Sequence, residues 1–307
     1  MQNVHRGHFK RFSHDKVLIQ KRRGQPARVL TGSANFSVRG LYVQANNVLV
    51  IDDPSTAALY ERAFEESFQD MRGFASSPIA AQWFEQRSAG LPDFSVCFSP
   101  HENAETSIGR VGAAIQKARS SVLFAVMELG GGGEVLDDLR KLASVGHVFS
   151  YGITQSAKGI SVYKPGSAHG VLSDFAALDK HVPPPFDKEW RGGPGQVIHD
   201  KFVVLDFNGD DPVVYTGSSN LASGGESSNG DNLLEIRDRA FATAFAVEAI
   251  RLVDHYHFRD AMENADPSAP LTLQGADPQG EKPWWDAYYD EREMKCQERE
   301  LFARAQP

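Results

Sequence analysis

The sequence predicts an α/β protein made of two similar domains, of which the first is incomplete. Between residues 94 and 154, strand-like segments alternate with amphipathic helical segments, a pattern typical of a mixed, mainly parallel sheet flanked by helices. An internal repeat gives the second observation, because residues 14–53 align without a gap with a later stretch of the chain. The third is the length of 307 residues, which is enough for about two domains and a substantial core.

The repeat brings the same polar residues back at the same spacing. His14-Asp15-Lys16 is followed by Gly32-Ser33-Ala34-Asn35, and His199-Asp200-Lys201 is followed by Gly217-Ser218-Ser219-Asn220. His199 minus His14 and Asn220 minus Asn35 both give 185. Composition alone hardly explains such a constellation of His, Lys, Ser and Asn. We interpret the two copies as the two halves of one active site.

The expected elements follow in chain order. We expect strands at 14–20, 29–31 and 47–51, the last buried on both faces, and a helix at 54–71. Further strands are expected at 94–99, 122–127 and 147–154, and helices at 106–119, 134–143 and 241–257, with a Gly-rich turn at 130–133. The stretch 156–196 is rich in Gly and Pro and is predicted to be irregular.

These elements divide the chain into three parts. Residues 1–90 are predicted to be the carboxy-terminal part of the first domain, residues 91–265 the complete second domain, and residues 266–307 an aromatic and charged helical tail. About 105 residues separate the strand beginning at Phe94 from His199, whereas 13 residues precede His14. By the repeat, about 90 residues of the first domain are therefore expected to be missing at the amino end.

Composition argues against several other classes of protein. The net charge of −8 argues against a general nucleic-acid coat protein, although residues 1–28 are strongly basic. Two cysteines cannot form a disulfide framework or a zinc site. No run of about 18 apolar residues and no signal peptide is found, so we expect no transmembrane segment and favour the cytoplasm, unless a true amino terminus lies upstream.

The repeated residues suit chemistry on a phosphoryl group. In a strand, residues two apart point to the same face, so each His should lie beside its Lys. The Lys can hold phosphate oxygens, and the His can attack phosphorus or transfer a proton. With two copies, one His can form a covalent phosphohistidine while the other protonates the leaving alcohol and then activates water. Neither a cofactor nor a metal is required, and no cluster shows metal-ligand spacing.

The pattern H-x-K-x4-D followed by G-S-x-N resembles the phospholipase D superfamily. The resemblance implies a two-domain α/β phosphodiesterase whose two motifs meet at one site. Carried over by position, it assigns catalytic or supporting roles to His14, Lys16, His199, Lys201 and Asp206, and substrate-phosphate binding to Ser33, Asn35, Gly217, Ser218 and Asn220. The stretch Asn229-Gly230-Asp231-Asn232 resembles the family's Asn-x-Glu-Asn, whose acid orients a catalytic His.

The first copy departs from this pattern at two positions. Lys21 stands where Asp206 stands in the second copy, and Asn46 stands where Asp231 stands. The loss of the first acid is expected to be tolerated, since that acid has a supporting role. The loss of the second is expected to leave one His less well oriented, as in a catalytic triad that lacks its acid.

The main hypothesis is a metal-independent hydrolase or phosphatidyltransferase of the phospholipase D type. By family analogy His14 is the nucleophile and His199 the general acid, although the order could be reversed. The expected substrate is a phosphodiester, with phospholipid before nucleic acid, and a lipid substrate implies transient contact with a membrane surface. The alternatives are a nuclease that uses the same site, and an inactive remnant that binds phosphate groups or a partner.

Overall fold

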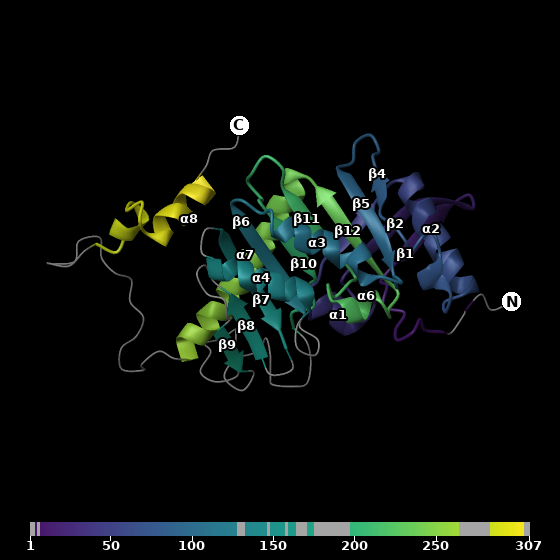
Figure 1. The fold of residues 1–307 in the computed structure, drawn as a ribbon, viewed down its shortest axis with the longest axis horizontal. Coiled ribbons are helices and arrows are strands. Elements are labelled where there is room, and N and C mark those ends of the chain that lie inside the picture. Colours follow the sequence, from purple (N-terminus) through teal and green to yellow (C-terminus); the bar gives the residue numbers. More distant parts are fainter. Residues whose placement is uncertain are drawn as a thin grey trace.

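The computed structural model contains two β-sheets with helices packed against them (Figure 1). It describes residue 4 and residues 7–127, 133–145, 148–156, 159–163, 171–174, 197–263 and 283–303. Strands between residues 18 and 51 form a three-stranded sheet, and strands between residues 84 and 237 form a nine-stranded sheet. The α/β class predicted from the sequence is confirmed.

The smaller sheet belongs to the first half of the repeat and is antiparallel throughout. Its strands are β1 (Leu18–Arg22), β2 (Gln25–Gly32) and β3 (Val48–Ile51); α1 (Val38–Tyr42) lies between β2 and β3, and α2 (Pro54–Gln69) follows β3. Helix α2 begins where the sequence predicts because Asp53 caps it. The Asp53 carboxylate accepts a hydrogen bond from the backbone N–H of Thr56 at 2.7 Å, and proline occupies the first turn.

The predicted burial of residues 47–51 on both faces is wrong. Val48 and Val50 are 44 and 57% exposed, whereas Ile51 is buried in one hydrophobic cluster with Leu59 of α2. Side chains alternate between the two faces of a strand, and α2 packs on one face of the small sheet. An apolar run therefore could not distinguish a strand covered on one face from one covered on both.

The larger sheet has the strand order β4-β5-β12-β11-β10-β6-β7-β8-β9. Its strands are β4 (Phe84–Gln86), β5 (Asp93–Ser99), β6 (Ser121–Met127), β7 (Phe149–Gln155), β8 (Gly159–Tyr163), β9 (Val171–Asp174), β10 (Phe202–Leu205), β11 (Val213–Gly217) and β12 (Asp231–Arg237). Its helices are α3 (Ile108–Ile115), α4 (Glu134–Val145), α6 (Ser223–Glu226) and α7 (Arg239–Glu263). Short 3-10 turns η1 (Phe74–Ser76) and η2 (Ala104–Thr106) complete this part.

The sheet is mixed, as predicted, but its pairings are mainly antiparallel and not mainly parallel. Among the described strands, only β6 and β7 pair in parallel, and the chain between them passes through α4. Residues 206–212 connect β10 to β11, a return too short for a parallel crossover, whereas β11 pairs antiparallel with β12 after a longer connection through α6. The strand-helix-strand alternation in the sequence therefore predicted the parallel pairing of β6 with β7 but not the pairing direction of the other strands.

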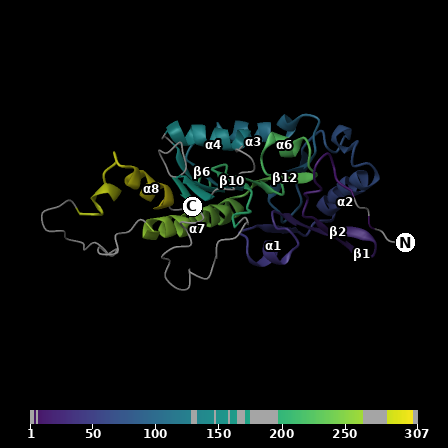
Figure 2. The ribbon, with the colours of Figure 1, turned by 90° about the horizontal axis from the view of Figure 1, so that it is seen from below.

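Helices cover both faces of the larger sheet. Viewed from below, α3 and α4 lie on one side of the strands and the long α7 on the other (Figure 2). Helices α3 and α4 share one hydrophobic cluster with one set of strand side chains, and α7 shares a second cluster with the opposite set and with the small sheet. The second cluster joins the two halves of the repeat in one continuous core.

Two further stretches differ from or extend the sequence predictions. The segment 156–196, predicted to be irregular, contains β8 and β9, and its remainder lies outside the described residues, as does most of the turn at 130–133. β4 pairs with β5 across the predicted domain boundary near residue 90. In the tail, η4 (Asp286–Tyr288) precedes α8 (Met294–Ala303), which rests on the body through Phe302 against Phe149 and Phe207.

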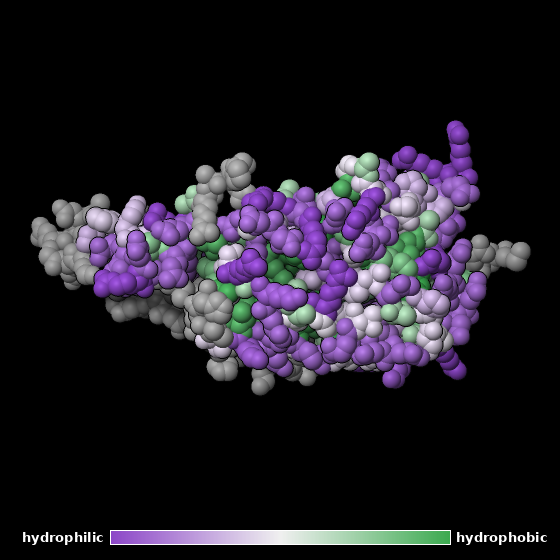
Figure 3. All heavy atoms as spheres, turned by 45° about the horizontal axis from the view of Figure 1, so that its top comes forward, coloured by the Kyte–Doolittle hydropathy of each residue, from purple (hydrophilic) through white to green (hydrophobic). Residues whose placement is uncertain are grey.

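The surface is largely hydrophilic, with separate apolar patches on the face drawn in Figure 3. Within the described part of the chain, no helix has both the length and the apolar character needed to cross a bilayer.

Candidate active site

The two His-x-Lys segments lie in extended chain just before β1 and β10, and not inside strands as predicted for residues 14–20. Each is held by the opposite half of the repeat. The backbone N–H of His14 donates to Gly230 O at 2.9 Å, and that of His199 donates to Ala45 O at 3.0 Å. The loop that carries Asp231 thus fixes the His14 segment, and the loop that carries Asn46 fixes the His199 segment.

Each histidine ring is held by a side chain from the other half. His14 Nδ1 lies 2.7 Å from Asp231 Oδ1, and His199 Nδ1 lies 2.8 Å from Asn46 Oδ1. Asn46 donates its amide N–H to Gly40 O, so its oxygen faces His199. Both partner oxygens are acceptors, which places a hydrogen on each Nδ1 and leaves each Nε2 with a free lone pair.

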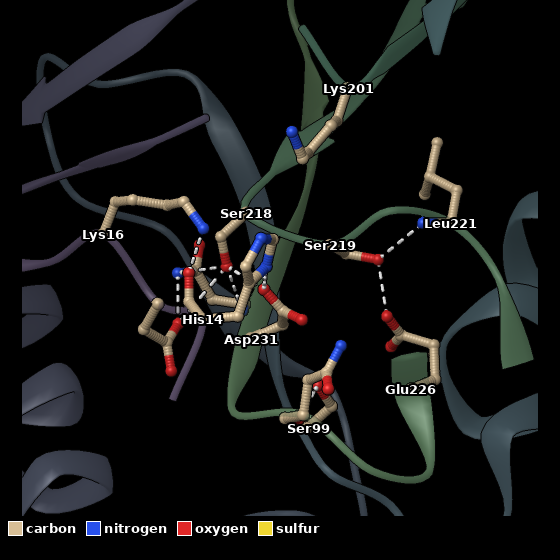
Figure 4. A network of polar contacts seen from close by, with 12 residues as sticks. His14, Lys16, Ser99, Lys201, Ser218, Ser219, Leu221, Glu226 and Asp231 are labelled. Carbon is tan, nitrogen blue, oxygen red and sulfur yellow. Dashed lines mark hydrogen bonds and ion pairs between the residues drawn. The ribbon is translucent and has the colours of Figure 1, made fainter. Parts of the chain in front are cut away.

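Serines in the repeated Gly-Ser turns hold these partners in place. Ser218 Oγ donates to Asp231 Oδ1 at 2.6 Å, and Ser33 Oγ donates to Asn46 Oδ1 at 2.9 Å. Figure 4 shows Ser218 and Asp231 grouped against His14, with Lys16 reaching in from the first half. Because a hydroxyl has one hydrogen, both serines here orient the partners of the histidines. Their role as donors to a substrate phosphate stays a prediction.

A further layer of paired contacts crosses between the halves. Asn232 donates its amide to Asp15 Oδ1 at 2.8 Å, and Asn47 donates to Asp200 Oδ1 at 2.9 Å. Thr31 and Thr216 donate to the oxygens of the two asparagines at 3.0 and 3.2 Å. No role was predicted for Asp15, Asp200 or these threonines, although each pair obeys the same 185-residue offset (200 − 15 and 216 − 31).

The glycine of each turn is required by close packing between the turn and the following strand. Gly32 and Gly217 have φ values of +142° and +152°. A Cβ added at these positions would lie 2.4 Å from Asn47 O and 2.3 Å from Asn232 O. A side chain fits at neither position, so the repeated glycines set the distance between each turn and its Asn.

Two lysines supply positive charge to the site. Lys201 is fully buried and its Nζ lies 3.3 Å from His199 Nδ1, while Lys16 Nζ donates to the backbone oxygen of His14. Burial lowers the pKa of Lys201 to about 7, with repulsion from Lys16 acting in the same direction. Burial lowers the pKa of Lys16 to about 8. Such a pair is stabilised by a bound anion, which restores the charge balance lost on burial.

Burial also governs the two histidines. Burial is the main cause that lowers the pKa of His14 to about 3, and repulsion from Lys16 and Lys201 acts in the same direction. Burial likewise lowers the pKa of His199 to about 3, together with repulsion from Lys201. Burial raises the pKa of Asp231 well above its ordinary range. His14 and Asp231 therefore share one proton between Nδ1 and Oδ1, and both rings are neutral near pH 7 before an anion binds.

Asp206 was predicted to be a catalytic or supporting residue. It directly follows β10, at the end of the strand opposite the His199 segment. Its carboxylate accepts hydrogen bonds from the backbone N–H groups of Arg119, Ser120 and Ser121, which lead into β6. In the first half Lys21 takes this position and pairs with Glu61 at the surface. The Asp of the motif thus anchors β10 to β6, and its placement does not support a catalytic role.

The two motif asparagines differ in their surroundings. Asn35 is exposed, whereas Asn220 is 9% exposed, and its side-chain oxygen has no hydrogen-bond partner among the described residues. The structure therefore brings together His14, Lys16, His199, Lys201, Asp231 and the two serines, and leaves Asp206 outside this group. Within the described residues, no three His, Cys, Asp or Glu side chains gather in a way that could hold a metal ion.

This arrangement contains the kinds of group that nucleophilic substitution at phosphorus uses. Two Nε2 atoms are available, two ammonium groups can neutralise phosphate oxygens, and one histidine has a carboxylate behind it. The other histidine has a neutral amide behind it. The two rings are thereby suited to different tasks, although the repeat builds them alike.

Two repeated halves that share one His-Lys site define a protein of the phospholipase D superfamily. The chain belongs to the family described as "Cardiolipin synthase, PLD-like domain", whose model matches residues 1–68 and 111–253, more than half of the chain. The superfamily predicted from the repeated motifs is therefore confirmed. At this level a phosphodiesterase or phosphotransferase type of function is supported.

Three solved structures show distant likeness to the chain. Polyphosphate kinase from Porphyromonas gingivalis is 12% identical with a TM-score of 0.44, over 80% of this chain and 33% of the kinase chain. Nuc from Salmonella typhimurium, a phospholipase D family member, is 19% identical with a TM-score of 0.32, over 55% of this chain and 94% of its own.

A third structure, TrmBL2, described as an archaeal chromatin protein, is 10% identical with a TM-score of 0.25, over 67% of this chain and 63% of its own. The chain thus spans a third of the length of the polyphosphate kinase chain. No curated protein matches the chain. Likeness at this level carries no argument about substrate or partner.

Proposed function

We propose that this chain transfers a phosphoryl group from a phosphodiester to water or an alcohol, without a metal, through a phosphohistidine intermediate. One observation supports this proposal more strongly than any other. Two imidazoles from repeated segments have their Nδ1 atoms held by partners from the opposite half, and both rings feel the charges of the same two buried lysines, Lys16 and Lys201. Each of the two steps needs both rings, one bonded to phosphorus and the other transferring a proton.

His14 is proposed as the nucleophile and His199 as the general acid. The carboxylate of Asp231 behind His14 supports positive charge on that ring when Nε2 bonds to phosphorus. Asn46 gives His199 an oriented Nδ1–H but no negative charge, so protonated His199 gives up its proton more readily. A bound phosphodiester anion supplies the negative charge that favours protonation of His199 before the reaction.

The proposed reaction balances in two steps. In the first, His14 Nε2 forms a bond to phosphorus, the bond to the leaving alcohol breaks, and the Nε2 proton of His199 passes to the alkoxide. In the second, His199 takes a proton from water or an acceptor alcohol, whose oxygen attacks phosphorus while the bond to His14 breaks. Lys16 and Lys201 neutralise the phosphoryl oxygens in both steps.

A phospholipid is the substrate class favoured for this chain, with nucleic acid second. The family to which the chain belongs is described by the name cardiolipin synthase, and the net charge of −8 disfavours a general nucleic-acid binder. A phospholipid substrate requires transient contact with a membrane surface. The basic residues of positions 1–28 favour the second class instead, so both substrates belong in the test.

The test compares three substrates with and without EDTA. Phosphatidylcholine vesicles, single-stranded DNA and bis(p-nitrophenyl) phosphate are each incubated with the wild-type protein and with the His199→Ala variant. Turnover by the wild type that survives EDTA, with steady turnover lost in the variant, supports the proposal and ranks the substrates. Loss of turnover on chelation contradicts the metal-free mechanism. Folded wild-type protein that acts on none of the three favours a phosphate-binding remnant without turnover.

A further inference from the structure

Another buried carboxylate, with no acidic counterpart at the repeated position, lies behind the site. Glu226, at the end of α6, is 1% exposed, and its carboxylate accepts hydrogen bonds from Ser219 Oγ and Ser107 Oγ, each at 2.5 Å. His101, 2% exposed, lies on the same carboxylate with Nε2 at 3.6 Å, and its backbone N–H donates to Glu226 O at 2.7 Å. The mechanism proposed above uses none of these groups.

The internal repeat provides a control for this feature. Position 226 minus 185 is 41, and Leu41 is 53% exposed on α1. The repeated architecture therefore does not need a carboxylate at this position. Burying a carboxylate is costly unless hydrogen bonds compensate, and Glu226 receives both serine hydroxyls.

Hydrogen bonds lead from Glu226 to the nucleophile side of the site. The Ser219 hydroxyl accepts from Leu221 N at 3.0 Å, so its own hydrogen is directed at Glu226. Its neighbour Ser218 donates to Asp231, which holds His14. Figure 4 shows these two serines on one turn, with Glu226 and Asp231 on the same side of it.

The negative charge of Glu226 acts on Asp231. It raises the pKa of Asp231 in the same direction as burial, and Asp231 Oδ2 has no hydrogen-bond partner among the described residues. The charged or titratable groups that face the His14–Asp231 pair are Asp15, Lys16, His199, Lys201 and Glu226; those that face Glu226 are Cys97, His101 and Asp231. Like Asp231, which has Asn46 at the repeated position, Glu226 is an anion of this half whose counterpart, Leu41, is uncharged.

We propose that Glu226 is a positioning residue, which fixes the turn of Ser218 and Ser219 and, by its negative charge behind Asp231, strengthens the hold of the His14–Asp231 pair on its shared proton. The hydroxyls of Ser219 and Ser107, which donate to it, compensate for the burial of this carboxylate. The consequence for catalysis, a more basic and more nucleophilic His14, rests on the proposed function. The effect on the proton of the pair does not require turnover.

The experiment compares Glu226→Gln with the wild type by two readouts. Histidine-labelled NMR follows the His14 ring through a pH titration, with the signal assigned by its loss in His14→Gln. The pH dependence of kcat/KM is measured on bis(p-nitrophenyl) phosphate, whose good leaving group needs little general acid and so reports on the nucleophile. Because Glu226→Gln removes a negative charge, we expect the midpoint of the His14 titration to move down by about 0.5–1 pH unit. The acid limb of the kcat/KM profile should move down by about the same amount. We expect kcat to fall about threefold to tenfold with KM unchanged.

Matched variants separate charge from structure. Glu226→Asp keeps the charge and disturbs the hydrogen bonds, so its midpoint should stay close to the wild-type value. Glu226→Leu installs the residue of the repeat and should behave like Glu226→Gln. Glu235→Gln neutralises another buried carboxylate, which pairs with Arg110 and Tyr215 away from the site, and should leave the midpoint of His14 unchanged.

Three results would overturn the proposal. The first is a His14 titration midpoint that is the same in the wild type and in Glu226→Gln. The second is a midpoint shift in Glu226→Asp as large as that in Glu226→Gln. The third is that Glu226→Gln and Glu226→Leu both fail to fold while Glu226→Asp folds. A wild type that turns over no phosphodiester contradicts the proposed function instead, and the NMR titration still decides the role of Glu226.

Discussion

The two halves of the site make equivalent backbone hydrogen bonds and differ in chemistry. His14 and His199 each lie in extended chain before a strand, each beside its Lys, and each held through Nδ1 by the opposite half. The partner is a carboxylate in one case and an amide in the other. Because both partners accept the same hydrogen, the geometry survives the exchange and only the charge changes. A repeated motif can thus keep its shape while its two copies take different tasks.

The segments that follow the two Gly-Ser turns differ as well. Residues 36–43 of the first half expose the apolar side chains Phe36, Val38, Leu41, Tyr42 and Val43. In the second half the corresponding segment is packed, with Leu221 and Glu226 each 1% exposed. There Ser107, between η2 and α3, contacts Glu226, and Glu134 of α4 contacts Ser223. Burial of a carboxylate near the site therefore depends on elements that stand beside one half only.

Replacing each histidine gives the largest expected difference between the halves. His14→Ala should lower release of p-nitrophenolate from bis(p-nitrophenyl) phosphate by at least about 10³-fold and abolish any burst, because no phosphoenzyme can form. His199→Ala should still give a burst of about one equivalent, followed by slow turnover, because the second step lacks its base. Rapid mixing measures the burst. A burst in His14→Ala and none in His199→Ala would reverse the assignment of the two rings.

Exchanging the partners tests the charge difference directly. Asp231→Asn should lower kcat by about 10²-fold, since His14 loses the carboxylate that supports its positive charge. Asn46→Asp should stay within about tenfold of the wild type and should move the basic limb of the pH profile upward, because a carboxylate beside His199 raises its pKa. Steady-state kinetics across pH measure both. Equal losses in the two variants would show that the halves are not specialised.

The lysines link anion binding to pH. The pKa of Lys16 is about 8 and that of Lys201 about 7, so both ammonium groups are present at low pH and are lost as the pH rises through these values. An anion that requires them should bind at least about tenfold more weakly at pH 9 than at pH 6. Calorimetric titration with tungstate measures this affinity. Lys21→Met is the control, because Lys21 pairs with Glu61 at the surface, and Lys201→Met should remove most of the pH dependence.

The smallest expected effect concerns the two positions that follow the His-x-Lys segments. Asp206→Ala should lower the free energy of unfolding by about 2 kcal/mol, because backbone N–H groups at the start of β6 lose their acceptor. Activity per folded molecule should be unchanged. Lys21→Ala should alter neither quantity measurably. Urea unfolding followed by an activity assay checks both variants. A loss of activity in folded Asp206→Ala would show that Asp206 contributes to catalysis after all.

Much of the site could be predicted from spacing alone. The 185-residue offset identified His14, Lys16, His199, Lys201 and both Gly-Ser turns. Crossed partners could not be predicted, because an offset does not tell which half's Asp231 or Asn46 reaches which ring. Asp206 was assigned to the site from its place in the motif, and the structure places it one strand away.

The fold shows the same division. Caps such as Asp53 and apolar runs located the helices and strands, because these signals are local. The direction of pairing was misjudged, since one strand-helix-strand unit was extended to a sheet in which antiparallel pairings dominate. Glu226 and His101 gave no signal, because neither lies in a repeated position with a polar counterpart.

The sequence by itself determined that the chain carries two copies of one His-Lys-Ser-Asn set, because a fixed offset is a property of the chain alone. Only the tertiary structure decided that Asp231 faces His14, that Asn46 faces His199, and that a buried glutamate stands behind one of them. These contacts join residues more than 100 positions apart, and their partners are chosen by packing between the halves.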